Sequence, residues 1–215
     1  IVNMSIKEYG LSCDNAFAQT FIPDRNVVTR RLPIPTAHLR LIQKTCRSTD
    51  DDLRWLIALI SDSGMRLAEA AGLLKADIQL DHEIPHVSLK PHAWRQLKTA
   101  NSERVIPLVG TSLWAARRIL ECTDTEFAFP LFTNATRCNS NSASATLNKW
   151  MKPLVPHGCV VHSFRHSLRD RLRAVETPSE IADVLGGWTS KSIGQSYGKG
   201  YDLPVLQRWM KRLEE

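Results

Sequence analysis

Two short stretches of the sequence place arginine where a phosphate group could bind. In "SGMRLAE", Arg66 follows a glycine suited to ending a helix and stands at the expected start of the next one. Main-chain N–H groups at a helix start attract anions, and a guanidinium beside them adds a fork of donors. In "HSFRH", His162 and Arg165 lie one helical turn apart and face the same way. These residues indicate phosphate chemistry, although Glu69 could simply form a surface ion pair with Arg66.

The same stretches give little support for a metal site. His162 and His166 have the i, i+4 spacing of paired metal ligands, but no glutamate follows the first histidine as in the HExxH arrangement. The five cysteines are scattered and form no CxxC pair. The acids at 50–52 stand at a predicted helix start, where the helix dipole favours negative charge. We therefore expect no cofactor and no metal, and the acids do not indicate a metal-dependent nuclease.

Three further candidates lie in predicted loops. Lys98 is on the turn that enters a strand in "QLKTANSERVIPL", where a lysine is ordinarily a solvated turn residue. The stretch "LGGWTSKSIGQSYGKGY" (185–201) holds five glycines, Trp188 and two of the three tyrosines, Tyr197 and Tyr201. Glycine costs a helix up to about 1 kcal/mol relative to alanine, so this stretch does not form one long helix. A tryptophan in a loop ordinarily anchors a core. None of these residues indicates a function by itself, so they are considered together with the arginine stretches below.

The composition describes a globular chain that can bury a core. It has 215 residues, of which 43% are hydrophobic and 23% charged. No apolar run approaches the ~20 residues that cross a bilayer. We find no secretory signal pattern, and scattered cysteines are typical of reduced thiols in a cytoplasm. Because the first residue is Ile1, we interpret the chain as a piece of a longer protein.

Charge is arranged in blocks along the chain. The net charge is +6, and residues 25–47 hold six bases and no acid. Residues 48–86 hold eight acids against three bases, and residues 90–118 hold six bases and one acid. A solvated surface more often mixes the two signs. The blocks indicate charge sorted onto faces, as nucleic-acid-binding proteins require.

The hydrophobic pattern predicts a mainly helical chain with a small sheet in its first half. Helices are predicted from Thr36, over 53–60 up to Gly64, over 67–74, after Thr111, near Trp150, from His162, after the capping-box pattern Thr177-Pro178-Ser179-Glu180, and over 203–215. Strands are predicted at 76–80, 86–90 and 104–108, and the Ser- and Asn-rich residues 133–146 are predicted to be a loop.

Two helical faces are predicted in detail. Leu113, Ala116 and Leu120 have the spacing of a buried face. The predicted tail helix over 203–215 carries its apolar residues on one side: Val205, Leu206, Trp209, Met210 and Leu213. Such a helix either folds onto its own core or docks on a neighbouring subunit, and we favour docking.

Taken together, the separated stretches resemble the tyrosine recombinases of the phage-integrase type. They are "SGMRLAEAAGLLKADI", "LKT" with "SERVIPL", "HSFRH", and "LGGW" followed by "SIGQSY", which puts Tyr197 nine residues after Trp188. The resemblance runs from about residue 36 to residue 201 and keeps both order and spacing. Each motif alone is weak, but the ordered set is specific. The "RLPIPTAHL" stretch is also similar to the junction where this family's catalytic domain begins.

The resemblance implies that the chain cleaves and rejoins DNA at specific sites through a 3′-phosphotyrosyl intermediate. Tyr197 would be the nucleophile, with Tyr201 as its rival, because a phenol with a pKa near ~10 leaves well enough for the bond to be reversed. Arg66 and Arg165 would stabilise charge on the non-bridging phosphate oxygens. No ATP is needed, because the covalent bond stores the energy of the broken one.

The remaining matched residues would assist. Lys98 would protonate the leaving 5′ oxygen, and His162 would act as acid or base on the tyrosine side. Trp188 stands where many family members carry histidine; its indole can donate or pack but cannot shuttle protons. Glu69 would orient Arg66.

The resemblance also implies the organisation and the partners. The fold would be α+β and mainly α: a helical catalytic domain with a small three-stranded antiparallel sheet over 36–215, preceded by a linker or tail of an upstream DNA-binding domain over 1–35. The partner would be double-stranded DNA at attachment sites, bound by a homotetramer, with the free chain a monomer or weak oligomer. The location would be the cytoplasm of a bacterial cell, at the nucleoid when bound to DNA.

Two alternatives remain open at this point. A type IB topoisomerase uses the same constellation of residues to relax DNA without a partner subunit. A catalytically inactive DNA-binding module would have the same fold, although no essential residue is missing here.

Overall fold

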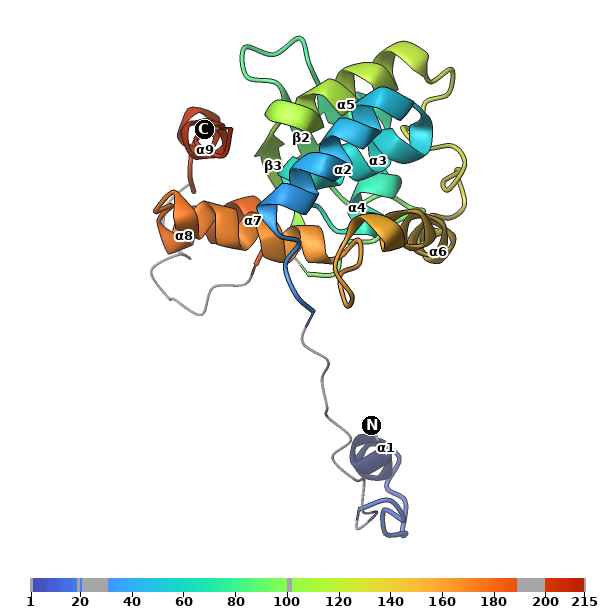
Figure 1. Cartoon of the computed structure of the whole chain (residues 1–215). Coiled ribbons are helices and arrows are strands. Elements are labelled where there is room, and N and C mark those ends of the chain that lie inside the picture. Colours follow the sequence, from blue (N-terminus) through green and yellow to red (C-terminus); the bar gives the residue numbers. More distant parts are fainter. Residues whose placement is uncertain (1, 19, 21–30, 100–101, 189–199, 215) are drawn as a thin grey trace. The chain divides into compact units, whose positions relative to one another are not determined.

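The computed structural model describes residues 2–18, 20, 31–99, 102–188 and 200–214, and the chain divides into two units (Figure 1). The first unit, residues 1–30, carries α1 (Val2–Glu8), which has no buried residue. The second unit, residues 31–215, carries the elements described below. The predicted linker over 1–35 and catalytic domain over 36–215 stay a prediction.

The second unit is mainly helical. Its helices are α2 (Thr36–Thr49), α3 (Asp52–Ser63), α4 (Leu67–Ala71), α5 (Gly110–Cys122), α6 (Ser140–Met151), α7 (Ser163–Ala174), α8 (Ser179–Gly186) and α9 (Leu203–Lys211), with short 3-10 turns η1 (Lys75–Asp77) and η3 (Lys152–Leu154). The strands β1 (Ile78–Gln79), β2 (His86–Leu89) and β3 (Arg104–Pro107) form an antiparallel sheet in that order. Val87 of β2 lies opposite Ile78 on one side and Ile106 on the other. The predicted fold class is confirmed.

Helix α3 forms the centre of the main core and packs against α2, α5 and α7. Every residue from Trp55 to Ser63 is buried. The Asp51 carboxylate caps the helix by accepting from the Arg54 N–H at 3.0 Å. The helix ends at Gly64 with φ 61°, as predicted, and a Cβ there would come within 2.3 Å of Leu168. Only glycine fits this turn, which delivers Arg66 to the start of α4.

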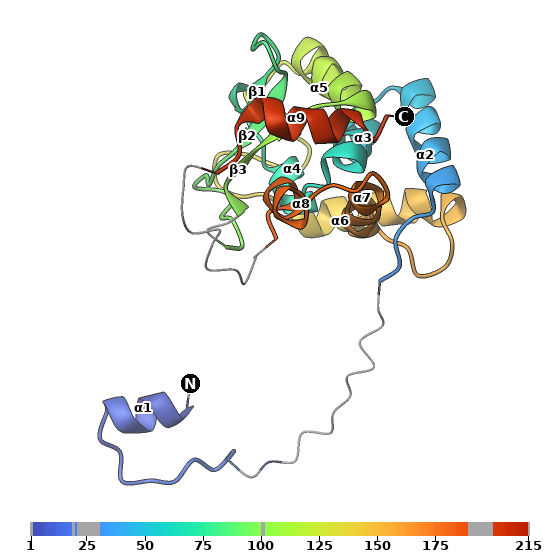
Figure 2. The ribbon, with the colours of Figure 1, turned by 90° about the vertical axis from the view of Figure 1, so that its left-hand side faces the viewer.

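A second core cluster joins the end of the chain to α7 and α8. Leu206 and Met210 of α9 are buried against Val109, Leu168 and Leu185, with other members of the cluster. Figure 2 shows α9 lying across β3 and beside α8, and α9 packs against β3. The tail helix therefore folds onto its own domain, and the prediction that it docks on a neighbour is wrong in this structure.

Two predicted boundaries are wrong for local reasons. Helix α6 begins at Ser140, inside the stretch predicted to be a loop, because Asn139 caps it by accepting from the Ser142 N–H at 3.1 Å. The capping box at 177–180 does not form: Pro178 takes the cap position of α8, and the buried Thr177 hydroxyl has no hydrogen-bond partner among the described residues.

One predicted helix end and one predicted buried face differ in part from the structure. Helix α4 ends at Ala71, before the predicted Leu74. In α5, Ala116 is buried as predicted, together with Ala115 and Ile119. Leu113 and Leu120 of the predicted face are only partly buried at the edge of the core.

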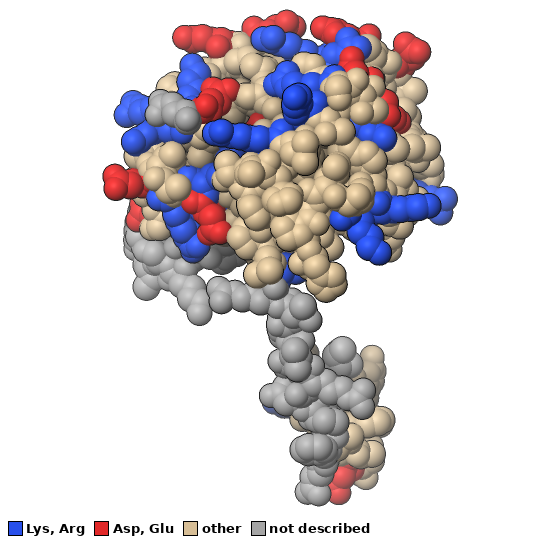
Figure 3. All heavy atoms as spheres, in the orientation of Figure 1, with Lys and Arg blue, Asp and Glu red and all other residues tan. Residues whose placement is uncertain are grey.

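The charge blocks seen in the sequence do not stay apart in the fold. Acids from residues 48–86 pair with bases from other parts of the chain: Asp50 with Arg118, Asp62 with Arg171, Asp77 with Lys90 and Glu69 with Arg104. On the face shown in Figure 3, acidic side chains lie along the upper edge and on the left side, where basic side chains lie among them. No helix in the described part of the chain is both long and apolar enough to cross a membrane.

Candidate active site

Arg66 stands at the start of α4 and is held by its own helix. Its main-chain N–H donates to Glu69 Oε2 at 2.9 Å, and its guanidinium donates to Glu69 Oε1 at 2.5 Å. The guanidinium also donates to the Ser102 hydroxyl at 2.9 Å. Glu69 is buried while the Arg66 side chain is 21% exposed. Glu69 therefore orients Arg66, as expected, and leaves part of the guanidinium open to a ligand.

Arg165 lies on α7 and is 4% exposed. Its two terminal nitrogens donate to the Gly64 carbonyl and to the Gly186 carbonyl, each at 2.7 Å. The turn at Gly64, which leads from α3 to Arg66, thus also binds Arg165. The structure brings the two predicted phosphate-binding arginines together from segments about 100 residues apart.

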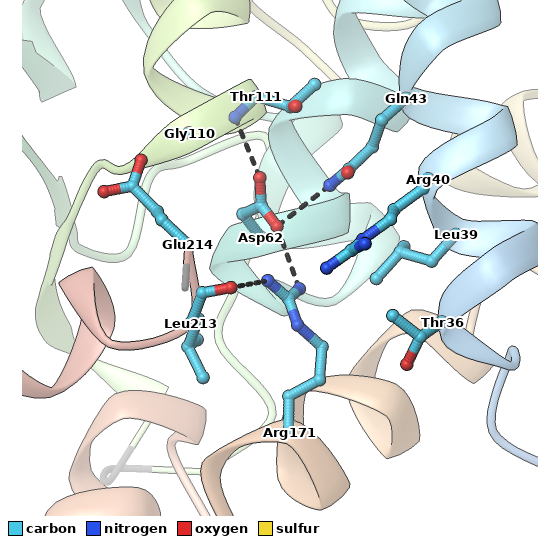
Figure 4. Close-up of a pocket in the computed structure, with 10 residues that line it drawn as sticks. All are labelled: Thr36, Leu39, Arg40, Gln43, Asp62, Gly110, Thr111, Arg171, Leu213 and Glu214. Carbon is cyan, nitrogen blue, oxygen red and sulfur yellow. Dashed lines mark hydrogen bonds and ion pairs between the residues drawn. The ribbon is translucent and has the colours of Figure 1, made fainter. Parts of the chain in front are cut away.

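A buried ion pair also holds α7 against α3, some two turns along α7 from Arg165. Asp62, 3% exposed, pairs with Arg171 at 2.8 Å and accepts from the Gln43 side chain and from the Thr111 N–H (Figure 4). Arg171 also donates to the Leu213 carbonyl at 3.2 Å. One buried carboxylate therefore joins α2, α3, α5 and α7, and Arg171 extends the network to the segment after α9. This network fixes the helix that carries Arg165.

Arg104, at the start of β3, is a site residue that the sequence analysis missed. It is buried and donates to Glu69 Oε2 at 3.0 Å, so that Glu69 bridges it to Arg66. A signal was present: side chains alternate along a strand, and Arg104 shares its face with the buried Ile106 while Val105 points outward. An arginine in the inward phase of a strand needs a buried partner. Arg66, Arg104 and Arg165 are called the arginine cluster below.

The carboxyl end of α8 meets all three arginines of the cluster. Three consecutive carbonyls accept one guanidinium each: Leu185 from Arg104 at 3.0 Å, Gly186 from Arg165 at 2.7 Å and Gly187 from Arg66 at 3.4 Å. The last carbonyls of a helix lack partners within the helix and carry its partial negative charge. The end of α8 therefore accepts the three guanidinium groups through its main-chain carbonyls.

The glycines of "LGGW" allow this approach. Gly187 has φ 61°, and a Cβ there would lie 2.7 Å from the Arg104 guanidinium. A Cβ at Gly186 would lie 2.0 Å from the Trp188 ring. Trp188 packs on two guanidinium groups, Arg165 at 5.1 Å and Arg169 at 4.8 Å from the ring centroid. Trp188 thus packs on the guanidinium groups of the site, and its predicted roles as a donor to the phosphate or as packing for the tyrosine loop stay predictions.

The titratable groups of the site are shifted by burial and by the nearness of other bases. His162, Arg165 and Trp188 line an open pocket of about 350 Å³. Burial, followed by the charge of Arg66, lowers the pKa of Arg165 to about 10. Partial burial and then the charges of Arg165 and neighbouring bases lower the pKa of His162 to about 4, although solvent reaches this residue and screens part of the effect. Arg104 and Arg66 outweigh burial and lower the pKa of Glu69, which stays ionised.

The remaining predicted residues are placed less directly. Lys98 is exposed on the connection between β2 and β3, and within the described residues no side-chain hydrogen bond or ion pair joins it to the cluster. Its neighbour Thr99 exchanges a hydrogen bond of 3.0 Å with Ser102, the hydroxyl that Arg66 binds. Tyr197 lies outside the described residues.

Tyr201 is held at the other end of α8 from the cluster. Its hydroxyl donates to the Glu180 carboxylate at 2.7 Å, and this bond raises the pKa of Tyr201. Glu180 is in the first turn of α8, about 9 Å along the axis from Gly186. Tyr201 is thus neither close to the arginine carbonyl contacts nor disposed to ionise, which weakens its candidacy as nucleophile.

The sequence model described as the phage integrase family matches residues 36–202. The chain therefore belongs to the phage integrase family and is a tyrosine-type site-specific recombinase. No curated protein matches the sequence.

Solved structures with a similar fold include complexes of the Tn1549 transposon integrase. One, in complex with a circular intermediate DNA, has a TM-score of 0.61 at 15% identity over 99% of this chain and 75% of that one. Another, in complex with transposon right end DNA, has a TM-score of 0.55 at 16% identity over 94% of this chain and 71% of that one. At these identities the likeness concerns the fold.

Proposed function

We propose that the chain cleaves and rejoins double-stranded DNA at attachment sites through a 3′-phosphotyrosyl bond to Tyr197. The observation that carries this proposal is the arginine cluster, in which Arg165 lines an open pocket and the Arg66 side chain stays partly exposed. Burial, and then the charges of Arg66 and Arg104, lower the pKa of Arg165 to about 10, in keeping with like charges that lie close together. A DNA phosphate would bring negative charge to these guanidinium groups.

In the forward step, the Tyr197 oxygen attacks phosphorus, the new oxygen–phosphorus bond forms and the bond to the 5′ oxygen breaks. Arg66 and Arg165 stabilise the additional charge on the non-bridging oxygens as the pentacoordinate phosphorus forms. Glu69 and the end of α8 keep both guanidinium groups in place before the substrate arrives, so little reorganisation is needed during the reaction.

Two proton transfers complete the step. With its pKa lowered to about 4, the His162 imidazole is neutral near pH 7 and can accept the proton of the tyrosine hydroxyl. Lys98 gives a proton to the departing 5′ oxygen from the connection between β2 and β3. Rejoining reverses both transfers. The positive charges of the site do what Mg²⁺ does in many nucleases, so we propose that cleavage needs no metal.

We further propose the setting in which this reaction occurs. Residues 36–215 form the catalytic domain, and residues 1–35 link it to an upstream DNA-binding domain. The structures named above are integrase complexes with DNA, which supports double-stranded DNA as the partner. A homotetramer would assemble on DNA from a monomer or weak oligomer, in the cytoplasm of a bacterial cell.

The test is the formation of a covalent protein–DNA adduct. The probe is a nicked duplex made from the end sequence of the DNA element that encodes the chain, which traps the cleaved strand. The parent should form an adduct in EDTA, and Tyr197→Phe should lose it while binding the duplex with nearly the same affinity. Tyr201→Phe should keep it. An adduct that survives Tyr197→Phe and is lost in Tyr201→Phe would overturn the assignment.

A further inference from the structure

Arg104 is a buried member of the arginine cluster and the one with the most complete set of protein partners. It is 8% exposed, and each of its three side-chain nitrogens has an acceptor in the protein. Nε donates to the Leu185 carbonyl at 3.0 Å, one terminal nitrogen to the Ser102 carbonyl at 2.7 Å and the other to Glu69 at 3.0 Å. Its guanidinium is thus occupied by the protein and is not available to a substrate.

The partners of Arg104 are the groups that orient the other two arginines. Glu69 accepts from Arg66 at its main chain and its guanidinium. The end of α8, which Arg104 holds through Leu185, provides the carbonyls that bind Arg165 and Arg66. Ser102 accepts Arg104 through its carbonyl and Arg66 through its hydroxyl. Each partner of Arg104, or a residue directly following it in the chain, therefore also binds Arg66 or Arg165.

We propose that Arg104 is a positioning residue of the reaction, which sets the geometry of Arg66 and Arg165 by joining Glu69 to the carboxyl end of α8. This inference rests on the proposed function and deepens it, since Arg104 acts through the two arginines and does not touch the DNA. A planar guanidinium can bind acceptors in different directions at once. A lysine ammonium at the same place is a single point charge. It would keep the bond to the Glu69 carboxylate or the bond to the Leu185 carbonyl, but not both.

The first measurement separates chemistry from binding. Arg104→Met should slow single-turnover adduct formation by about 10²-fold, the loss expected when catalytic groups shift by about 1 Å. The affinity for the uncleaved duplex should change by less than about threefold, because Arg104 is buried away from the DNA. Arg104→Lys should recover only part of the rate.

The matched control is Arg95, another buried arginine that donates to main-chain carbonyls, those of Lys90 and Gly72. It makes no hydrogen bond to Glu69 or to α8 in the described structure. Arg95→Met should lower the melting temperature as Arg104→Met does, yet keep the adduct rate near that of the parent. Equal losses of rate in the two variants would show that Arg104 acts only through stability and would overturn the inference.

The second measurement uses pH, because Arg104 is the strongest of the groups that keep Glu69 ionised. Arg66, Arg95, Arg104 and Arg165 are the charged groups that face Glu69, and without Arg104 the effect of burial raises the pKa of Glu69. The rate of Arg104→Met relative to the parent should therefore fall as the pH is lowered. In Arg104→Met combined with Glu69→Gln, no carboxyl titrates and the relative rate should not vary with pH. A flat ratio in the single variant would contradict the proposal.

A third readout needs no cleavage. Inorganic sulfate, used as a probe for phosphate, should raise the melting temperature of the parent and of Arg95→Met, and raise that of Arg104→Met clearly less. If the parent forms no adduct that depends on Tyr197, the proposed function fails, while the sulfate experiment still decides the role of Arg104. Equal sulfate stabilisation in all three proteins would overturn that role.

Discussion

The indole of Trp188 lies against the guanidinium of Arg165, 5.1 Å from ring centroid to guanidinium carbon. Such a contact contributes about 0.5–2 kcal/mol, so its loss should slow adduct formation by about twofold to thirtyfold in Trp188→Ala. Trp188→Phe keeps an aromatic face but removes the indole N–H, and it should retain most of the rate. If Trp188→Phe is as slow as Trp188→Ala, the N–H donates to the phosphate and the packing role is secondary.

Gly186 provides the space that Trp188 occupies. Since a Cβ at this position would lie 2.0 Å from the ring, Gly186→Ala should displace the indole, change the tryptophan fluorescence and slow adduct formation about as much as Trp188→Ala does. The double variant Gly186→Ala/Trp188→Ala has no clash and should be no slower than Trp188→Ala alone. A further loss in the double variant would show that Gly186 is needed for a different reason.

His162 should make stability depend on pH in the absence of DNA. Its pKa is lowered from 6.5 to about 4, so the unfolded chain binds this proton more readily than the folded one. The free energy of unfolding should therefore fall as the pH decreases through that window and be unaffected by this group above it. His162→Gln should remove this part of the pH dependence, as measured by urea denaturation at several pH values. Equal slopes for parent and variant would be inconsistent with the shift.

The tail helix should stabilise the isolated domain. Met210 is fully buried in the second core cluster, so Met210→Ala should lower the free energy of unfolding by about 2–5 kcal/mol. Arg208→Ala, on the same helix but outside that cluster, should change it by less than about 0.5 kcal/mol. Urea denaturation of the free protein measures the free energy of unfolding of both variants. A Met210→Ala variant as stable as the parent would restore the view that the tail belongs on a neighbouring subunit.

Lys98 can be tested through its leaving group. If it protonates the 5′ oxygen, Lys98→Ala should slow cleavage of ordinary DNA by about 10²–10⁴-fold. A substrate with sulfur at the bridging 5′ position releases a thiolate that needs no proton, so it should restore the rate of Lys98→Ala nearly to that of the parent. Arg66→Ala should not be restored, because its charge acts on the non-bridging oxygens. The reverse pattern of rescue would exchange the two roles.

Most of the fold could be predicted because its helices follow the spacing of their apolar residues. The burial of Leu39, Ile42 and Cys46 in α2 and the stop of α3 at Gly64 agree with that spacing. The prediction failed where a local polar contact decided the boundary, as at Asn139, whose cap starts α6 within a polar stretch. It also failed for the tail, because an amphipathic face does not say which apolar surface it covers.

The site was predictable as far as it depends on side chains at recognisable spacing. Arg66 binds Glu69, and Arg165 binds the carbonyl of Gly64 in the turn just before Arg66. Arg104 was missed because Glu69 and Leu185 are distant from it in the sequence, and because two of its three acceptors are main-chain carbonyls, which no pattern of residue types reveals. Its inward phase on β3, beside Ile106, was the available clue.

The acceptors at the end of α8 belong to the backbone, and this determines which substitutions can remove a contact of the arginine cluster. Any residue at position 185 still presents a carbonyl, so variation there can alter packing without deleting the acceptor that Arg104 uses. Each of the three arginines, in contrast, can be lost through a single nucleotide change in its codon. Genetic damage to the cluster that does not act through the core is therefore expected to fall on the donors and on the two glycines.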